Sequence, residues 1–126
     1  MGKCRILLVD DEKDIVFVIK EGLERQGFEV DAYNDPRKAL ADFRPDIYDL
    51  LISDIRMPGL TGVQLFKELK TIDKKVSVLF LTAFEIPDKE WQSILHNQGV
   101  IEFIEKPVTM QYLVDVILRI KAATVY

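Results

Sequence analysis

Four apolar runs in this chain of 126 residues each end in side chains that can take part in chemistry. Those side chains are, in chain order, the carboxylates of Asp10 and Asp11, the carboxylate of Asp54, the hydroxyl of Thr82 and the amine of Lys106. Short apolar runs without polar alternation are typical of buried parallel strands, and in an open α/β sheet the carboxyl ends of the strands form the ligand crevice. We therefore expect these side chains to meet in one crevice.

The combination of these side chains indicates metal-assisted phosphoryl chemistry. Clustered carboxylates repel one another, and a bound cation relieves that repulsion. Three hard oxygen donors with no histidine or cysteine nearby suit Mg²⁺, which also accepts a phosphate oxygen. An aspartate such as Asp54 can attack phosphorus and form an acyl phosphate. Lys106 would then supply positive charge, and Thr82 a hydroxyl donor, to the arriving phosphoryl group.

Each of these residues alone also has a structural explanation. Asp10 or Asp11 would serve equally well as the N-cap of the helix that follows them. A threonine at a strand end, such as Thr82, is usually structural, and a lysine such as Lys106 is usually a solvated surface residue. Their joint placement on four strand ends is what favours a functional site. A cis peptide bond before Pro107, which the sequence leaves open, would help to aim the Lys106 side chain.

Alternating strands and helices must position these residues. Apolar runs predict five strands, at about residues 5–9, 28–33, 48–53, 76–81 and 100–105. Helical spacing predicts five helices, at about residues 14–26, 35–44, 61–72, 87–98 and 109–120, with N-caps at Asp35, Thr61 and Thr109. This alternation favours a doubly wound α/β fold, in which helices cover both faces of a five-stranded parallel sheet. We expect the flavodoxin-like strand order 2-1-3-4-5.

Length and composition limit the class of protein. A chain of this length with 48% hydrophobic and 30% charged residues is ordinary for one globular domain, which we expect to span residues 1–126. The net charge of −4 argues against direct binding to nucleic acid. The single cysteine, Cys4, allows no internal disulfide and suits a reducing compartment. Because the sequence has neither an apolar run long enough to span a membrane nor a signal-peptide pattern, we expect a cytoplasmic protein.

Four motifs together resemble those of the receiver domains of two-component response regulators. They are Asp10-Asp11, the segment from Asp54 to Gly59, Thr82-Ala83 and Lys106-Pro107, and the resemblance extends from the first strand to the last helix. It is closest in architecture to the stand-alone, chemotaxis-type receivers. The resemblance implies a phosphorelay protein that is not an enzyme, apart from catalysing its own phosphorylation and dephosphorylation.

The resemblance also implies roles for individual residues. A phosphoryl group would pass from a histidine of a sensor kinase to Asp54. Mg²⁺ would be held by Asp11, Asp54 and the backbone carbonyl of Arg56, while Asp10 would act mainly through metal-bound water. Thr82 and Phe103 would form the switch, the threonine moving to the phosphoryl group and the aromatic ring turning inward. On pattern alone, Phe103 is an ordinary core residue of the fifth strand.

The first helix carries apolar residues on a side where receivers usually carry polar ones. These residues are Val16, at the border of the buried face, and Phe17, which falls on the polar side with Glu21 and Glu24. We expect Phe17 to dock the helical bundle of the kinase, as the first helix does in similar receivers. The alternative is a ring that folds down over neighbouring side chains.

Apolar residues also extend around the last helix beyond its core stripe. Tyr112 lies on one side of the stripe and Val114 and Leu118 lie on the other, while Ile101 begins the fifth strand nearby. By resemblance, the face built from the fourth helix, the fifth strand and the last helix is the one that changes on phosphorylation. We expect it to bind a downstream target or a second copy of the chain, unless the fourth helix covers Leu118.

Three other functions can be weighed against this pattern. A haloacid-dehalogenase-type phosphatase also has a strand-end aspartate, but it needs a second aspartate two residues later, where this chain has Arg56. A receiver-like scaffold that works without phosphorylation is compatible with the fold, but it would not need the whole set of acidic and switch residues. Dinucleotide binding is excluded because no glycine lies between Gly2 and Gly22, where the phosphate loop should be. The only histidine, His96, is expected on the surface and not as a phosphodonor.

Overall fold

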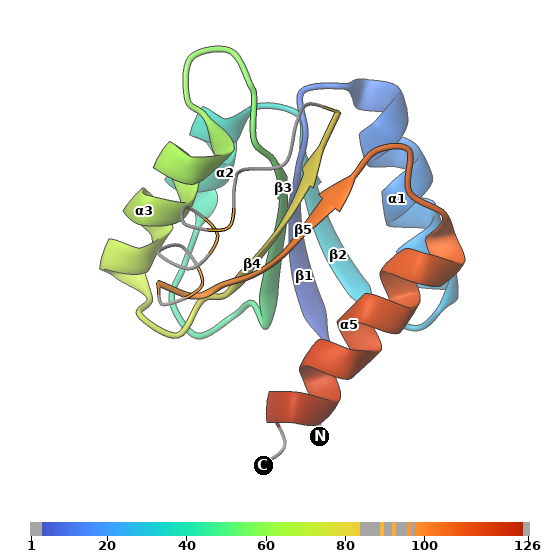
Figure 1. Cartoon of the computed structure of the whole chain (residues 1–126). Coiled ribbons are helices and arrows are strands. Elements are labelled where there is room, and N and C mark those ends of the chain that lie inside the picture. The colour runs from blue at the N-terminus through green and yellow to red at the C-terminus, as the bar shows by residue number, and fades with distance from the viewer. Residues whose placement is uncertain (1–3, 84–88, 90–91, 93–95, 97, 125–126) are drawn as a thin grey trace.

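Five parallel strands form one sheet in the order β2-β1-β3-β4-β5 (Figure 1). The computed structural model describes residues 4–83, 89, 92, 96 and 98–124. The strands are β1 (Arg5–Val9), β2 (Glu29–Tyr33), β3 (Leu50–Asp54), β4 (Val78–Thr82) and β5 (Val100–Glu105). The predicted doubly wound sheet and its strand order are therefore confirmed.

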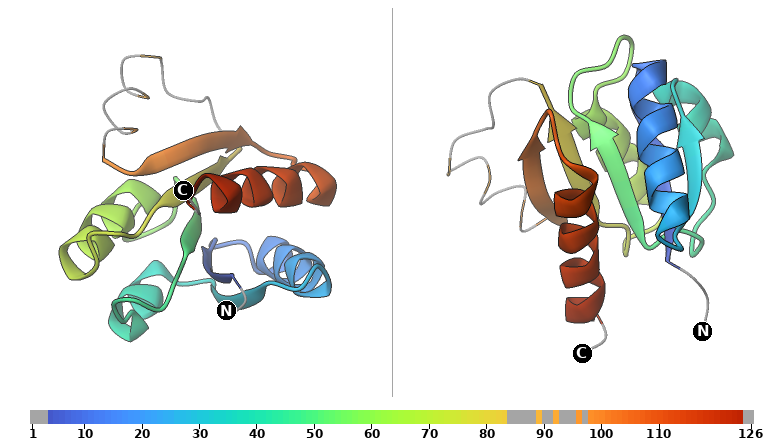
Figure 2. Two further views of the ribbon diagram at one scale, coloured as in Figure 1. Left: turned by 90° about the horizontal axis from the view of Figure 1, so that it is seen from below. Right: turned by 90° about the vertical axis from the view of Figure 1, so that its right-hand side faces the viewer.

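The helices cover both faces of this sheet. They are α1 (Lys13–Arg25), α2 (Pro36–Asp42), α3 (Gly62–Ile72) and α5 (Met110–Thr124). Helices α1 and α5 lie on one face and α2 and α3 on the other, as the two views of Figure 2 show. The helix predicted at about residues 87–98 falls mostly outside the described residues.

The N-caps explain where several helices begin. The side chain of Asp35 accepts a hydrogen bond from the backbone N–H of Arg37, and Pro36 occupies the first helical position of α2. Thr61 and Gln64 form a reciprocal capping box at the start of α3. The N–H of Tyr112 donates to Thr109 Oγ1 over 3.1 Å at the start of α5. All three predicted N-caps are confirmed.

The core consists of two layers, one on each face of the sheet. The layer under α1 and α5 contains Ile6, Leu8, Leu23, Ile52 and Leu113, together with the buried free thiol of Cys4. The layer under α2 and α3 contains Leu7, Leu51, Leu65, Phe66 and Phe80. Successive residues of β1 and β3 alternate between the layers, which is why residues 6–9 of β1 and 50–52 of β3 form uninterrupted apolar runs. This burial fixes the ends of the central strands, where the functional side chains lie.

Two strands begin two residues later than predicted. Strand β3 begins at Leu50 and β4 at Val78, although Tyr48 and Val76 extend the apolar runs towards the N-terminus. The ring of Tyr48 stacks on that of Phe43 with centroids 5.7 Å apart, and Val76 is buried in the α2–α3 layer. Both residues are therefore apolar because they pack in the core, and this packing does not require them to pair with a neighbouring strand.

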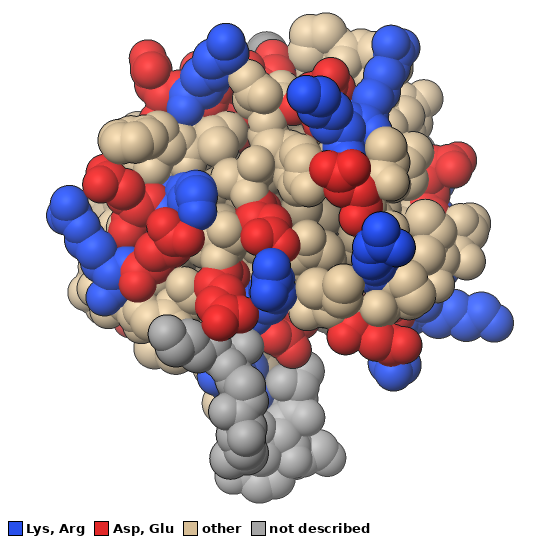
Figure 3. Space-filling view, turned by 180° about the vertical axis from the view of Figure 1, so that it is seen from behind, with Lys and Arg blue, Asp and Glu red and all other residues tan. Residues whose placement is uncertain are grey.

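Positive and negative side chains are mixed on the face opposite to the one that Figure 1 shows. Figure 3 shows Lys and Arg side chains interspersed with Asp and Glu over this face. Within the described residues, no helix combines the length and the apolar composition that crossing a membrane requires.

Candidate functional site

The carboxyl ends of β1, β3 and β5 bring Asp10, Asp54 and Lys106 together. The Nζ atom of Lys106 lies 2.7 Å from Asp10 Oδ2 and 3.2 Å from Asp54 Oδ2, and donates a hydrogen bond to each. All three side chains are at least nine-tenths buried. Strands β1 and β3 are direct neighbours, which is why residues 44 positions apart in the sequence can share one cation. Two buried carboxylates thus depend on a single buried ammonium group.

Backbone N–H groups support both carboxylates from the loops that follow the strands. The N–H of Glu12 donates to Asp10 Oδ1 over 2.9 Å, and the N–H of Arg56 donates to Asp54 Oδ1 over 3.3 Å. In each carboxylate, therefore, one oxygen accepts a hydrogen bond from a backbone N–H and the other accepts one from Lys106. Hydrogen bonds of this kind satisfy oxygens that burial removes from water, so they help to stabilise both side chains in a buried place.

Lys106 is held in position by its own backbone. Its N–H donates to the carbonyl of Thr82 over 2.7 Å, and the peptide bond between Lys106 and Pro107 is cis. Burial lowers the pKa of the Lys106 ammonium, but the hydrogen bond and charge of Asp10, followed by those of Asp54, outweigh this effect and raise the pKa above its ordinary value. The side chain is accordingly a permanent cation at neutral pH.

A glycine allows α3 to begin directly against the end of β3. The N–H of Gly62 donates to the carbonyl of Ile55 over 2.7 Å, and a Cβ atom at Gly62 would overlap the carbonyl oxygen of Asp54. Any larger residue must therefore push α3 away from the strand end. The importance of Gly62 for the position of Asp54 was not predicted, because the close approach involves backbone atoms that a pattern of side chains does not report.

The structure places a third carboxylate, Glu12, beside Asp10 and Asp54. Ligand oxygens of Asp10, Glu12 and Asp54, one from each residue, all lie within 4.8 Å of one another; we call these residues the acidic cluster. The predicted ligand Asp11 is exposed and is not in this cluster. Glu12 directly follows the acidic pair in the sequence, and this proximity was the available signal for including it.

An open hollow of about 650 Å³ lies next to the acidic cluster. Its lining, which defines what we call the acidic hollow, consists of Asp11, Glu12, Asp54, Arg56, Met57, Pro58, Thr61 and Ala83. Asp11 and Arg56, two of the predicted metal-binding residues, therefore border the same space as Asp54. The hollow gives a small anion or a partner's side chain access to Asp54, which is otherwise buried.

The two predicted switch residues lie on adjacent strands near this site. Thr82 is buried at the end of β4 and pairs with Glu105 of β5. Phe103 is partly buried, and its ring stacks on that of Phe80 with centroids 5.5 Å apart and planes at 28°. The ring of Phe103 therefore already has an aromatic partner in the core layer between the sheet and α3.

The predicted contact surfaces are only partly as expected. Phe17 on α1 is 62% exposed, and Tyr112 and Leu118 on α5 are 47% and 50% exposed. Val114 was expected in the apolar patch on α5, but this is wrong, because the side chain is buried in the core layer under α1 and α5. Val114 belongs to the same buried cluster as residues of α1 and of the sheet, so the buried face of α5 is wider than the usual stripe and includes Val114.

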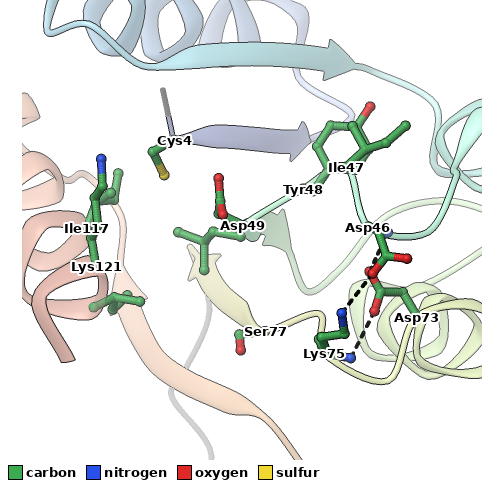
Figure 4. Close-up of a pocket in the computed structure, with 12 residues that line it drawn as sticks. Cys4, Asp46, Ile47, Tyr48, Asp49, Asp73, Lys75, Ser77, Ile117 and Lys121 are labelled. Carbon is green, nitrogen blue, oxygen red and sulfur yellow. Dashed lines mark hydrogen bonds and ion pairs between the residues drawn. The ribbon is translucent and has the colours of Figure 1, made fainter. Parts of the chain in front are cut away.

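A second hollow, of about 610 Å³, lies at the opposite end of the sheet (Figure 4). Cys4 and Ile117 line its apolar side, and Asp46, which forms an ion pair of 2.9 Å with Lys75, borders the other. Burial, followed by the charge of Asp49, raises the pKa of the Cys4 thiol, so the thiol stays protonated at neutral pH. This hollow contains none of the residues predicted for the functional site.

Comparisons with known proteins agree with this geometry. A family model described as the response regulator receiver domain matches residues 6–118. The C4-dicarboxylate transport transcriptional regulatory protein DctD of Rhizobium meliloti is 32% identical over 110 residues, which are 87% of this chain and 24% of that protein. The chain spans about a quarter to a half of the length of the curated relatives that it matches.

Two solved structures are similar along nearly their whole length. The non-phosphorylated HemR receiver domain from Leptospira biflexa is 30% identical, has a TM-score of 0.83, and the match covers 94% of each chain. The response regulator TrrA from Thermotoga maritima, solved in complex with Mg²⁺-BeF, is 30% identical with a TM-score of 0.74, and the match covers 93% of this chain and 98% of that one. With the family model matching most of its length, the chain belongs to the response regulator receiver domains of two-component systems.

Proposed function

We propose that residues 1–126 form a single receiver domain that accepts a phosphoryl group on Asp54 and changes its binding to partners in response. The observation that carries this proposal is the position of Asp54: its carboxylate is buried, is bonded to Lys106 and borders an open hollow. A carboxylate oxygen with access from one side is suited to attack a phosphorus atom that enters through the hollow.

The transfer step follows from this arrangement. A carboxylate oxygen of Asp54 forms a bond to the phosphorus of a phosphohistidine on a sensor kinase, and the bond from phosphorus to the imidazole nitrogen breaks with its electron pair going to that nitrogen. The product on this chain is an acyl phosphate. Lys106 balances the negative charge of the phosphoryl oxygens, and Thr82 supplies a hydroxyl donor once the end of β4 moves towards them.

Mg²⁺ is the metal that fits the residues around Asp54. The cluster offers only hard oxygen donors, with ligand oxygens of Asp10, Glu12 and Asp54 within 4.8 Å of one another and Asp11 bordering the same hollow. We propose that Asp11, Asp54 and the backbone carbonyl of Arg56 hold the ion and that Asp10 contacts its bound water. When bound, Mg²⁺ would neutralise charge on the carboxylates and on the phosphoryl oxygens.

In this proposal the protein acts as a signalling switch in the cytoplasm and not as an enzyme that turns over a separate substrate. The residue two positions after Asp54, where a phosphatase of the haloacid dehalogenase type needs an aspartate, is the exposed Arg56. The same phosphoryl group would shift Thr82 and turn Phe103 further inward, and thereby change the face formed by β5 and α5. The downstream partner would bind at that face.

Labelling with acetyl phosphate tests the proposal without a kinase. Acetyl phosphate and Mg²⁺ should add one phosphoryl group to the wild-type chain, measured by intact-mass spectrometry, and none to the Asp54→Asn variant. Asp42→Asn, which neutralises an exposed aspartate on α2, is the matched control and should be labelled like the wild type. Equal labelling of Asp54→Asn and Asp42→Asn would overturn the assignment of Asp54.

A further inference from the structure

We infer that Glu12 is a positioning residue for Lys106. Its carboxylate holds the ammonium group of Lys106 in the resting site, and this slows the movement of the ammonium group towards an arriving phosphoryl group. This inference rests on the proposed function, because it concerns how Lys106 reaches the phosphoryl group on Asp54. Three observations support it: the fixed backbone of Glu12, its distance from Lys106, and its location between two hollows.

The backbone of Glu12 is fixed on both sides. Its N–H donates to Asp10 Oδ1 over 2.9 Å, and its carbonyl oxygen accepts a hydrogen bond from the N–H of Val16 over 3.1 Å. Glu12 is also the N-cap residue of α1, but its side chain makes no capping hydrogen bond. The side chain therefore starts from a defined place and is not engaged by the helix that it begins.

Lys106 is the group that this side chain meets. Glu12 Oε1 lies 3.6 Å from Lys106 Nζ, beyond the 2.7 Å contact with Asp10 and the 3.2 Å contact with Asp54. The Glu12 side chain is 58% exposed, whereas that of Lys106 is only 8% exposed. Asp10 and Asp54 thus hold the ammonium group from inside the protein, and Glu12 holds it from the solvent side.

A phosphoryl group on Asp54 changes the competition for Lys106. Its oxygens lie further out than the free carboxylate of Asp54, so the ammonium group must turn towards them while Asp10 continues to accept from it. The ion pair with Glu12 opposes that movement, because the ammonium group cannot lie at its shortest distance from the Glu12 carboxylate and from the phosphoryl oxygens at the same time. Glu12 also adds negative charge at the entrance through which an anionic phosphodonor arrives.

Glu12 lies where such a contact can be made and broken. It lines the acidic hollow beside Asp54 and also a neighbouring apolar groove of about 520 Å³, formed mainly by Ile15, Val18, Pro107 and Val108. Since its carboxylate is solvated on one side, it can swing away from Lys106 at little cost. The effect on rate should therefore be that of one partly exposed ion pair, about two- to fivefold.

Three variants separate this role from a general effect of charge. Glu12→Gln removes the negative charge, and Glu12→Asp keeps the charge but shortens the side chain by one methylene, so that it no longer reaches Lys106. Asp14→Asn removes an exposed charge from the first turn of the same helix and is the control. Labelling by acetyl phosphate is followed at an Mg²⁺ concentration that saturates each variant. We expect both Glu12 variants to be labelled about two to five times faster than the wild type, and Asp14→Asn to match the wild type.

A direct measurement on Lys106 gives a second readout. In protein labelled with ¹⁵N-lysine, the Nζ signal that is lost in Lys106→Arg should shift in both Glu12 variants and stay in place in Asp14→Asn. Three results would each overturn the positioning role. They are wild-type rates in both Glu12 variants, a wild-type rate in Glu12→Asp alone, and an unshifted Nζ signal. None of these results would affect the proposed function, which fails only if Asp54→Asn is labelled like the wild type.

Discussion

Lys106 makes a shorter contact with Asp10, at 2.7 Å, than with Asp54, at 3.2 Å. The cation beside the proposed phosphoacceptor is therefore anchored to a different carboxylate, which modification of Asp54 would leave unchanged. Such an anchor would allow Lys106 to turn towards the proposed phosphoryl group without leaving the site. It also means that the loss of Lys106 removes the buried ammonium group that pairs with both acids, which has consequences for stability.

Replacing Lys106 by methionine should lower the free energy of unfolding at neutral pH by about 3 kcal/mol, since breaking a buried ion pair leaves uncompensated charge. Mg²⁺ should recover part of this loss, because the ion binds the folded site and not the unfolded chain. Urea unfolding with and without Mg²⁺ measures both effects. Lys75→Met removes the exposed pair with Asp46 and should change stability little. A Lys106→Met variant as stable as Lys75→Met would contradict the buried pairing.

Replacing Gly62 by alanine should destabilise the protein by about 2 kcal/mol, the usual cost of forcing an extra methyl group into a packed site. The new Cβ atom would overlap the carbonyl oxygen of Asp54, and backbone cannot move aside as a side chain can. Gly22→Ala is the control, because its Cβ atom would meet only the flexible end of the Met110 side chain. Thermal unfolding compares the two variants, and equal melting temperatures would contradict the close approach of α3 to β3.

The sequence predicted the sheet, its strand order and the meeting of Asp10, Asp54 and Lys106, because these depend on short-range patterns and on one general rule. Apolar runs identify buried strands, capping residues identify helix starts, and the carboxyl ends of parallel strands meet at one edge. Glu12 and Gly62 depend instead on local backbone geometry. The turn after β1 directs Glu12 and not Asp11 towards Lys106, and the contact of Gly62 is with a carbonyl oxygen.

Val114 shows a further limit of pattern reasoning. Its place on the helical wheel lies outside the central stripe of α5, and it was therefore assigned to the surface. Its burial depends on how α5 packs against the other members of the same core layer, which come from β1, β4 and α1 among others. A residue at the border of a helical stripe is thus buried or exposed according to the partner surface, which its own helix does not encode.

Asp73 should contribute stability that depends on pH. Hydrogen bonds from the backbone N–H groups of Asp46 and Lys75 lower the pKa of the Asp73 carboxyl below its ordinary value. A pKa lowered by folding adds stability that is fully present above the unfolded value, about 3.9, and is lost as the pH falls through the folded value. Asp73→Asn should therefore cost roughly 1 kcal/mol at pH 7, and the difference from the wild type should shrink below pH 4. Urea unfolding from pH 7 to pH 3 measures it, and a difference that grows towards low pH would contradict the assignment.

Phe17 should matter for transfer from a kinase and not for the chemistry at Asp54. Its ring is 62% exposed on α1, next to Val18, which lines the apolar groove beside Lys106. With a purified sensor kinase that labels the wild type, Phe17→Ser should slow phosphotransfer about tenfold. This is the loss expected for one aromatic contact at an interface. Labelling by acetyl phosphate should be unchanged, and Phe17→Tyr, which keeps the ring, should behave like the wild type. Equal slowing with both phosphodonors would indicate a folding defect instead.

Leu118 should belong to the output surface. It is half exposed on α5, and Ile101 and Phe103 lie on the neighbouring strand β5. An exposed apolar patch on a folded domain usually marks an interface, and a partner can report phosphorylation only if it prefers one of the two states. Further inward rotation of Phe103, which already stacks on Phe80, would change this face where the patch begins.

We therefore expect beryllofluoride with Mg²⁺, a mimic of the phosphoryl group, to raise the mass measured by light scattering from that of one chain towards that of two. Leu118→Glu should abolish the increase, and Phe17→Ser, which removes an exposed aromatic ring from a different helix, should leave it intact. If Leu118→Glu and the wild type associate alike, with and without beryllofluoride, the partner contacts another part of the surface.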